Sequence, residues 1–269
     1  MILRSHNIFK MVFVLACALP CQAVGQHFDI FLARPAAGTK TIVGGADVDA
    51  LNFDDATRVF EAEMGAVAGE FLALEPGVNH PNLEASVSAY PSSAVGLATG
   101  DVLSLFERDF NVAGSINDLF FWNGVGAVGF GPATADFRVE GGDPLGSTAG
   151  AGGAFDDHPF LVVDSDAQPG IYLASVYGAV AGFDPSAPVF LVMGTDGLIT
   201  ADFLGITQEE FELLSDEELD EALEQVIEVA VDYVHANVIV PEPASLALAG
   251  IMLCAAVLLP RPRRKGRNG

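Results

Sequence analysis

Residues 170–180 read GIYLASVYGAV and residues 188–192 read PVFLV, and these two stretches decide the fold class that the sequence predicts. Both are short apolar runs rich in β-branched and aromatic residues, as buried strands are. Similar runs recur from residue 28 onward, separated by turns such as Glu75-Pro76-Gly77. Short strands with turn signals between them favour an antiparallel β-sandwich, so we predict a mainly β, jelly-roll-like sandwich for residues 26–204.

The first strand is expected in His27-Phe28-Asp29-Ile30-Phe31-Leu32, where apolar and polar side chains alternate. Further along, Gly44-Gly45 predicts a break in the second strand, because glycine weakens a strand interior. Residues 47–55 are then expected to form an acidic loop.

Residues 205–240 have a different pattern, which predicts an acidic, amphipathic helical segment. Two capping boxes are present, one from Thr207 to Glu210 and one from Ser215 to Glu218. We therefore expect a short helix over 209–214 and a longer one over 216–236. The apolar side chains of the longer helix fall on one face: Leu219, Leu223, Val226, Ile227, Ala230 and Val234. This face is expected to pack on the chain's own domain; docking of a partner is the alternative.

The N-terminal residues have the composition of a secretory signal peptide. Arg4 and Lys10 form the basic region, and residues 11–19 are an apolar core of the usual length. Pro20 ends this core, and residues 23–25 offer small side chains for cleavage. We therefore expect residues 1–25 to be removed and the mature chain to be exported.

The C-terminal segment, residues 241–267, has three parts in a fixed order. Pro241-Glu242-Pro243 can continue neither a helix nor a strand. Residues 244–260 are apolar, and as a helix would be about 25 Å long, at the short end of a transmembrane span. A basic cluster follows, which the positive-inside rule places in the cytoplasm: Arg261, Arg263, Arg264, Lys265 and Arg267.

This order resembles the PEP-CTERM sorting signal of exported bacterial proteins, also known as the ice-binding protein C-terminal motif. The resemblance implies recognition and cleavage by an exosortase-type membrane transpeptidase. It also implies a route: export through the inner membrane, transient anchoring by the transmembrane helix over 244–260, and delivery to the cell surface or the exopolysaccharide matrix. An ice-binding role gains no support from the sequence, which shows no repeated threonine ladder.

The predicted mature domain is strongly acidic and lacks cysteine. Residues 26–240 hold five of the twelve Lys and Arg residues and thirty-five of the thirty-six Asp and Glu residues, a net charge of −30. Such a charge repels nucleic acid, so we expect no nucleic-acid partner. All three cysteines lie in the terminal segments, so no disulfide is available to the mature domain.

Two sets of side chains are candidate metal ligands. His27 and Asp29 lie on one face of the first predicted strand, and His158 follows two aspartates; together they could hold a transition metal. Loop carboxylates are the ligand type that calcium needs, which makes Ca²⁺ the one cofactor that the sequence suggests. The calcium candidates are Asp47, Asp49, Asp164 and Asp166. Solvated turns and strand ends are the alternative for both sets.

His27-Phe28-Asp29-Ile30 also resembles the start of certain bacterial surface-anchored β domains, which open with His-x-Asp-Ile. Those domains imply a β fold but no particular activity. Motifs of hydrolases, nucleotide-binding proteins and zinc proteases are absent, so we expect no enzyme. The sequence predicts a non-catalytic structural or adhesive protein that associates with exopolysaccharide or with like chains. A calcium-, metal- or carbohydrate-binding module is the alternative, and a polysaccharide-acting enzyme is less favoured.

Overall fold

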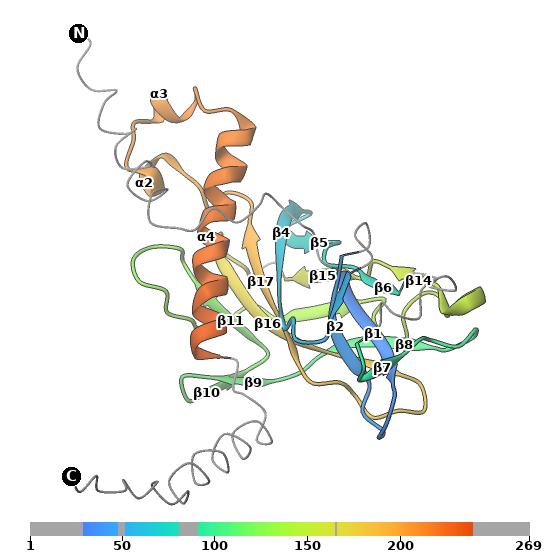
Figure 1. Cartoon of the computed structure of the whole chain (residues 1–269). Coiled ribbons are helices and arrows are strands. Elements are labelled where there is room, and N and C mark those ends of the chain that lie inside the picture. The colour runs from blue at the N-terminus through green and yellow to red at the C-terminus, as the bar shows by residue number, and fades with distance from the viewer. Residues whose placement is uncertain (1–28, 48–51, 81–90, 165, 239–269) are drawn as a thin grey trace, which may run out of the picture.

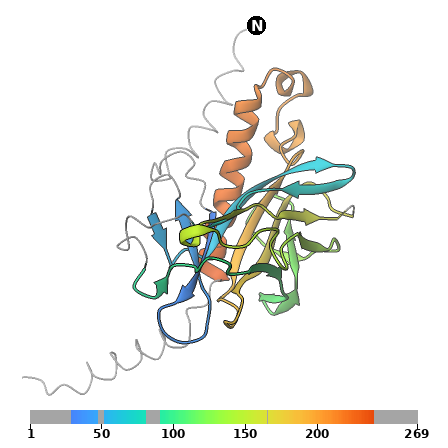
Figure 2. The same ribbon diagram turned by 90° about the vertical axis from the view of Figure 1, so that its right-hand side faces the viewer.

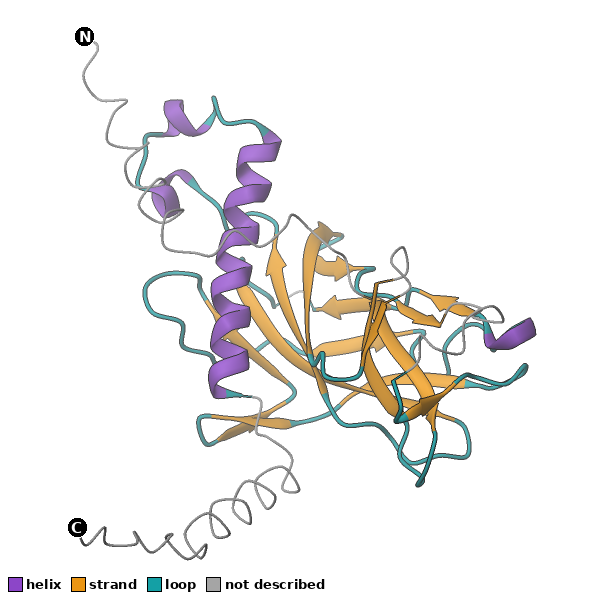
Figure 3. Cartoon of the chain, in the orientation of Figure 1, coloured by secondary structure: helices purple, strands orange, loops and turns teal. Residues whose placement is uncertain are grey.

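The computed structural model describes residues 29–47, 52–80, 91–164 and 166–238, and it is mainly β (Figure 1, Figure 3). Two curled sheets pack face to face, and a long helix covers the outer face of the larger one. The predicted β class is thereby confirmed. The predicted signal peptide, the Pro-Glu-Pro motif, the transmembrane helix and the basic cluster all lie outside the described residues.

The smaller sheet brings the start of the chain together with two later segments. Its order is β14 (Phe155–Asp157), β6 (Val78–His80), β1 (Asp29–Pro35), β2 (Ile42–Asp47) and β3 (Asn52–Asp54), with β7 (Ala94–Val95) also paired to β1. Because β1, β6 and β14 are neighbours, their ends place side chains from three parts of the sequence close together.

The larger sheet is built around β16 (Ile171–Val180) and β17 (Val189–Thr195), the two stretches that decide the fold. Its order is β12 (Gly131–Pro132), β11 (Leu119–Trp122), β16, β17, β4 (Val59–Val67), β5 (Glu70–Ala73), β15 (Phe160–Val163) and β13 (Phe137–Glu140), with β8 (Leu103–Glu107) also paired to β16. The β4–β5 hairpin projects from the body (Figure 2). A separate hairpin consists of β9 (Phe110–Val112) and β10 (Ser115–Asn117), and a 3-10 turn spans Ala151–Gly153.

The prediction of an antiparallel sandwich is wrong for one strand pair in each sheet. β17 runs parallel to β4, and β1 runs parallel to β6. In both pairs the strands are distant in the sequence, so no hairpin turn fixes their relative direction. The remaining pairs of described strands are antiparallel.

Strand β16 is buried on both faces, which explains its nearly continuous apolar sequence. Tyr172 and Ala174 point into the core between the two sheets, where they join Ile30 of β1. Ile171 and Leu173 point the other way, into the core beneath the long helix. One strand thus supplies side chains to two hydrophobic cores.

The helical segment follows the sheets as α2 (Ala201–Leu204), α3 (Gln208–Phe211) and α4 (Asp216–Asn237). Both capping boxes form as predicted, at Thr207 and at Ser215. The apolar face of α4 packs against β17 and β4, and it buries Leu223, Ile227, Ala230 and Val234. The prediction that this face packs on the chain's own domain is confirmed. Across the described part of the chain, no helix has the length and apolar character needed to span a membrane.

The Gly44-Gly45 pair lies inside β2 and does not break it. A β-carbon on Gly44 would lie 2.1 Å from the carbonyl oxygen of Asp54. The glycine is therefore needed for close approach of the chain after β3, and the prediction of a strand break is wrong for this reason.

Candidate functional site

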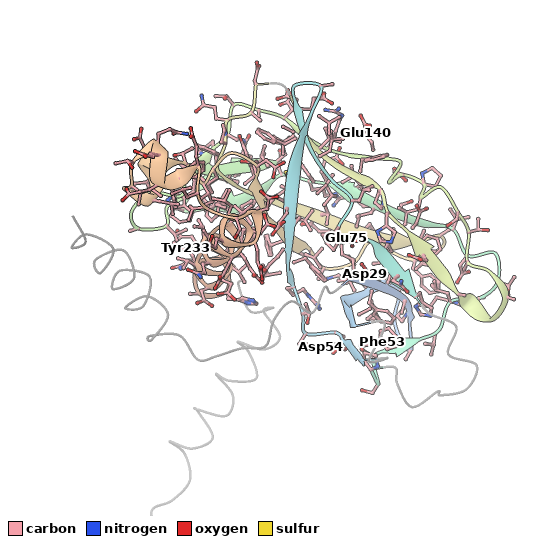
Figure 4. The ribbon with its side chains drawn as sticks, turned by 90° about the horizontal axis from the view of Figure 1, so that it is seen from above. Asp29, Phe53, Asp54, Glu75, Glu140 and Tyr233 are labelled. Atoms are coloured by element: carbon pink, nitrogen blue, oxygen red, sulfur yellow. The ribbon has the colours of Figure 1, made fainter. Side chains whose placement is uncertain are left out.

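Four titratable side chains gather where β1, β5, β6 and β14 end. They are Asp29 at the start of β1, Glu75 after β5, Asp156 in β14 and His158 just beyond β14, and we call them the His158 cluster. Figure 4 shows Asp29 and Glu75 close together at this edge. The parallel pairing of β1 with β6 and the antiparallel pairing of β14 with β6 bring these segments together.

The His158 ring is surrounded by acceptors. Its Nδ1 lies 3.3 Å from a carboxylate oxygen of Glu75 and 3.2 Å from the carbonyl oxygen of Leu74. Its Nε2 lies 3.2 Å from Oδ1 of Asp156. Because carboxylates and carbonyls only accept, both ring nitrogens must donate to satisfy this arrangement, and that requires the protonated imidazolium.

The electrostatics of the ring agree with its geometry. Burial by itself lowers the pKa of His158, but the Leu74 carbonyl and the negative charges of Glu75, Asp156 and Asp29 oppose it, and the pKa is raised above its ordinary value. The ring is about one third exposed, so water screens these interactions. His158 is thus the positive centre of an otherwise acidic cluster.

Asp29 experiences the opposite environment. Burial and the neighbouring charge of Glu75 raise the pKa of Asp29, while the Gly77 N–H and the charge of His158 act to lower it. The Gly77 N–H donates to both carboxylates, 3.1 Å to Asp29 and 3.0 Å to Glu75. The two carboxylates therefore share one donor at a partly desolvated position.

An open pocket of about 460 Å³ adjoins the cluster. Asp156 belongs to both: its Oδ1 faces His158, and it accepts a 3.5 Å hydrogen bond from Nδ2 of Asn79. The pocket is lined by Asn79, His80, Ser147, Thr148, Gly150, Ala154, Phe155 and Asp156. Hydroxyl, amide and carboxylate groups therefore line the same hollow.

His80 is fully buried at the inner wall of this pocket. Its Nε2 accepts a 3.2 Å hydrogen bond from the Leu97 N–H, so its Nδ1 carries the proton and donates to the Leu32 carbonyl at 2.9 Å. Burial lowers the pKa of His80 to about 4. The ring is neutral and joins β6 to β1 and to the segment around Leu97.

The structure brings together part of the metal site that the sequence predicts. Asp29 and His158 lie in one cluster, but His27 is outside the described residues. Sequence reasoning missed Glu75, which stands in a predicted turn, and Asn79, which lies in β6. The two aspartates before His158 were noted in the sequence, but Asp156 was not included in the predicted site although its Oδ1 lies 3.2 Å from Nε2 of His158.

The calcium candidates stand in separate places. Asp164 follows β15 of the larger sheet, and its carboxylate accepts a 3.2 Å hydrogen bond from the Asp166 N–H, which closes a local turn. Asp47 ends β2 of the smaller sheet, and Asp49 is outside the described residues. Over the described ranges, no group of three His, Cys, Asp or Glu side chains is arranged to hold a metal ion.

Comparisons with known proteins do not assign this chain to a family. No family model matches the sequence, and no curated protein is similar to it. A solved structure with partial similarity is that of a family 123 glycoside hydrolase from Clostridium perfringens, studied for glycolipid glycan hydrolysis. The match has 10% identity and a TM-score of 0.20, and it covers 52% of this chain and 23% of that one. At this level the likeness supports no conclusion about fold or activity.

Proposed function

We propose that this chain is an exported protein of the bacterial cell surface or extracellular matrix, sorted by its C-terminal segment and serving a non-catalytic structural or adhesive role. The observation that carries the proposal is the order of Pro241-Glu242-Pro243, the apolar residues 244–260 and the basic cluster from Arg261 to Arg267. An exosortase-type transpeptidase is the processing partner. Exopolysaccharide or like chains are the partners after delivery.

The architecture of the described domain is compatible with this route. Helix α4 packs along the larger sheet and ends at Asn237, four residues before Pro241. The jelly-roll-like sandwich is accordingly delivered as one body, with the sorting segment directly attached to it. The net charge of −30 over residues 26–240 keeps such a body soluble at a hydrated surface.

Sorting is tested in a bacterial host that carries an exosortase. We expect the full chain to be processed near the Pro-Glu-Pro motif and to become accessible to protease added outside the cells. Replacing Pro241, Glu242 and Pro243 by alanine should leave an unprocessed, membrane-held chain. The matched control is Asn237→Ala, an exposed residue at the end of α4. Equal processing of the triple variant and the control would contradict the proposal.

The pocket beside the His158 cluster favours a second candidate function, a carbohydrate- or cation-binding module. Asn79, Asp156, Ser147 and Thr148 provide the donors and acceptors that sugar hydroxyls need. A small number of placed polar groups that orient the ligand is typical of binding pockets.

This second function has a direct binding test. Isothermal titration with fragments of the host's exopolysaccharide should give heat with the wild-type chain and much less with Asp156→Asn, which keeps the side-chain shape and removes its charge. A thermal melt in EDTA and in calcium, at one high ionic strength, tests the cation. A calcium ion that binds only the folded state adds about 2.7 kcal/mol to the free energy of unfolding at a hundredfold excess over Kd. The melting temperature should therefore rise in calcium.

A further inference from the structure

The acidic residues are not spread evenly over this chain. Residues 110–135 contain a single acid, Asp118, and no Lys or Arg, although residues 26–240 hold thirty-five acids. The segment forms the β9–β10 hairpin, strand β11 and the loop that leads to β12. We call the exposed residues of 110–135 the neutral surface.

The neutral surface presents apolar side chains to solvent. Ile116 of β10 is 70% exposed and Val125 of the β11–β12 loop is 62% exposed. The hairpin is fastened to the sheet: Nδ2 of Asn117 donates to the carbonyls of Leu119 and Ala133, and the ring of Phe110 packs edge-on against Phe120 at 4.9 Å. The exposed apolar groups are therefore held in place by the body of the domain.

The β9–β10 hairpin of this surface lies at the C-terminal end of α4, whereas the start of the β11–β12 loop lies against α2, where a β-carbon on Gly124 would be 3.2 Å from the ring of Phe203. Val112 and Phe130 share one hydrophobic cluster with Val234 and Val238, and Phe130 lies 5.9 Å from the ring of Tyr233. The two views agree in placing the β9–β10 hairpin at the lower end of α4 (Figure 1, Figure 2). After Asp232 the helix carries no further acid, so its last turn is also free of negative charge.

The length of the following chain limits how far the C-terminal end of α4 lies from the apolar segment. Only residues 239–243 separate Val238 from the apolar segment 244–260. At about 3.3–3.6 Å per extended residue, that linker reaches roughly 20 Å. When the apolar segment is in a bilayer, the C-terminal end of α4 is held within that distance of the lipid. The acid-rich start of α4 lies roughly 33 Å away along a helix of 22 residues.

We propose that the β9–β10 hairpin of the neutral surface faces the membrane and rests on the lipid bilayer while the chain is anchored. This inference rests on the proposed function, because it needs residues 244–260 to be in the membrane. An acidic domain is repelled by anionic headgroups, so the face turned to the bilayer should be one with few acids. Tethering raises the local concentration, so a small apolar contact through Ile116 is enough.

The test uses residues 26–269, the chain left after removal of the predicted signal peptide, in phosphatidylcholine vesicles, with Cys254 replaced by serine. A single cysteine then replaces Ile116 and carries an environment-sensitive fluorophore. The control position is Leu213, which is 81% exposed and precedes the opposite end of α4. Lipids that bear a nitroxide should quench the label at 116 several-fold more than the label at 213.

The outcomes separate this inference from the proposed function. Flotation with the vesicles reports insertion of the apolar segment. A chain that does not float overturns both the anchoring step and the membrane-facing surface. A chain that floats but shows equal quenching at 116 and 213 overturns the surface alone. A blue-shifted but unquenched label at 116 would mean that protein, and not lipid, covers Ile116, which also overturns it.

Discussion

The His158 ring lies directly against the backbone of Gly77: a β-carbon on residue 77 would come within 2.5 Å of Cε1 of the ring. The same glycine donates its N–H to Asp29 and to Glu75. One residue thus gives the ring its space and holds two of the carboxylates that surround it. A side chain at this position has no room without displacement of the ring.

Gly77→Ala is therefore expected to disturb the whole cluster. Overpacking at a tight site costs about 1–3 kcal/mol, and we expect the free energy of unfolding in urea to fall by an amount in that range. The control is Gly131→Ala, because a β-carbon on Gly131 meets nothing within 4 Å. Equal stability of the two variants would show that His158 moves aside at no cost.

His158 should make the stability depend on pH near neutrality. The folded state raises the pKa of His158, so the stability that its charge provides is present below the unfolded value of about 6.5 and is lost as pH rises through the folded value. His158→Gln removes this contribution. We expect the stability difference between the two proteins to shrink from about pH 6 to about pH 9, by at most about 1 kcal/mol for partly exposed ion pairs. Chemical denaturation across that range measures it, and a difference that stays constant would contradict the prediction.

The charge of Asp29, unlike that of His158, should lower the stability of the fold at neutral pH. Burial and the charge of Glu75 raise the pKa of Asp29, so its ionisation above about pH 4 costs stability in the folded state. Asp29→Asn removes that cost and keeps an oxygen to accept from the Gly77 N–H. We expect the melting temperature at pH 7 to rise by roughly 2–4 °C or less, with no gain at acid pH. Scanning calorimetry at both pH values measures the two melting temperatures. A lower melting temperature for Asp29→Asn than for the wild type at pH 7 would refute the expected destabilisation by the charge of Asp29.

Much of the fold could be predicted because the sequence pattern and the local structure agree. The strands predicted over 170–180 and 188–192 are observed over 171–180 and 189–195, and they and the capping boxes at Thr207 and Ser215 follow from local periodicity and hydrogen bonding. The parallel pairing of β4 with β17 could not be predicted, because it depends on which distant strands meet. The prediction for the glycines of β2 was wrong for a related reason, since the need for Gly44 comes from Asp54 of the neighbouring strand β3.

The candidate site was predicted only in part. Asp29 and His158 were recognised as residue types that suit a site, and the structure brings them together. Glu75 joins them through the β5–β6 turn, which in sequence looks like an ordinary Glu-Pro-Gly turn. The pocket depends on Asn79 of β6 and Ser147 of a distant loop. No spacing in the sequence shows that these segments are neighbours.

His80 should make the domain sensitive to acid. The pKa of His80 falls from about 6.5 to about 4 on folding. The stability that the neutral ring provides is therefore present above about pH 6.5 and is lost as the pH falls toward 4. A shift of this size corresponds to roughly 3 kcal/mol. His80→Leu leaves the Leu32 carbonyl and the Leu97 N–H unpaired, at about 1–3 kcal/mol each. We expect the difference in free energy of unfolding between the wild type and His80→Leu to become smaller from pH 7 to pH 4, as measured by urea denaturation. A difference that grows in acid would overturn the assignment of a neutral His80 ring.

The packing of α4 on the larger sheet depends on a second close approach. A β-carbon on Gly194 of β17 would lie 2.6 Å from Cδ1 of Ile227, in the buried face of the helix. Gly194→Ala should therefore push the helix outward and lower the free energy of unfolding by about 1–3 kcal/mol. Ile227→Ala should cost about 2–5 kcal/mol by leaving a cavity at the same place.

The two changes should partly compensate, because the methyl group that Gly194→Ala adds occupies space that the shortened side chain at 227 vacates. We expect the double variant to be more stable than the sum of the single effects by about 0.5–3 kcal/mol, measured as a double-mutant cycle in urea. Ile227→Ala with Gly131→Ala is the control pair, since Gly131 has no neighbour within 4 Å for an added β-carbon to meet. Strict additivity for Gly194 and Ile227 would mean that the sheet and the helix adjust independently, and that Gly194 is not what sets how closely α4 packs.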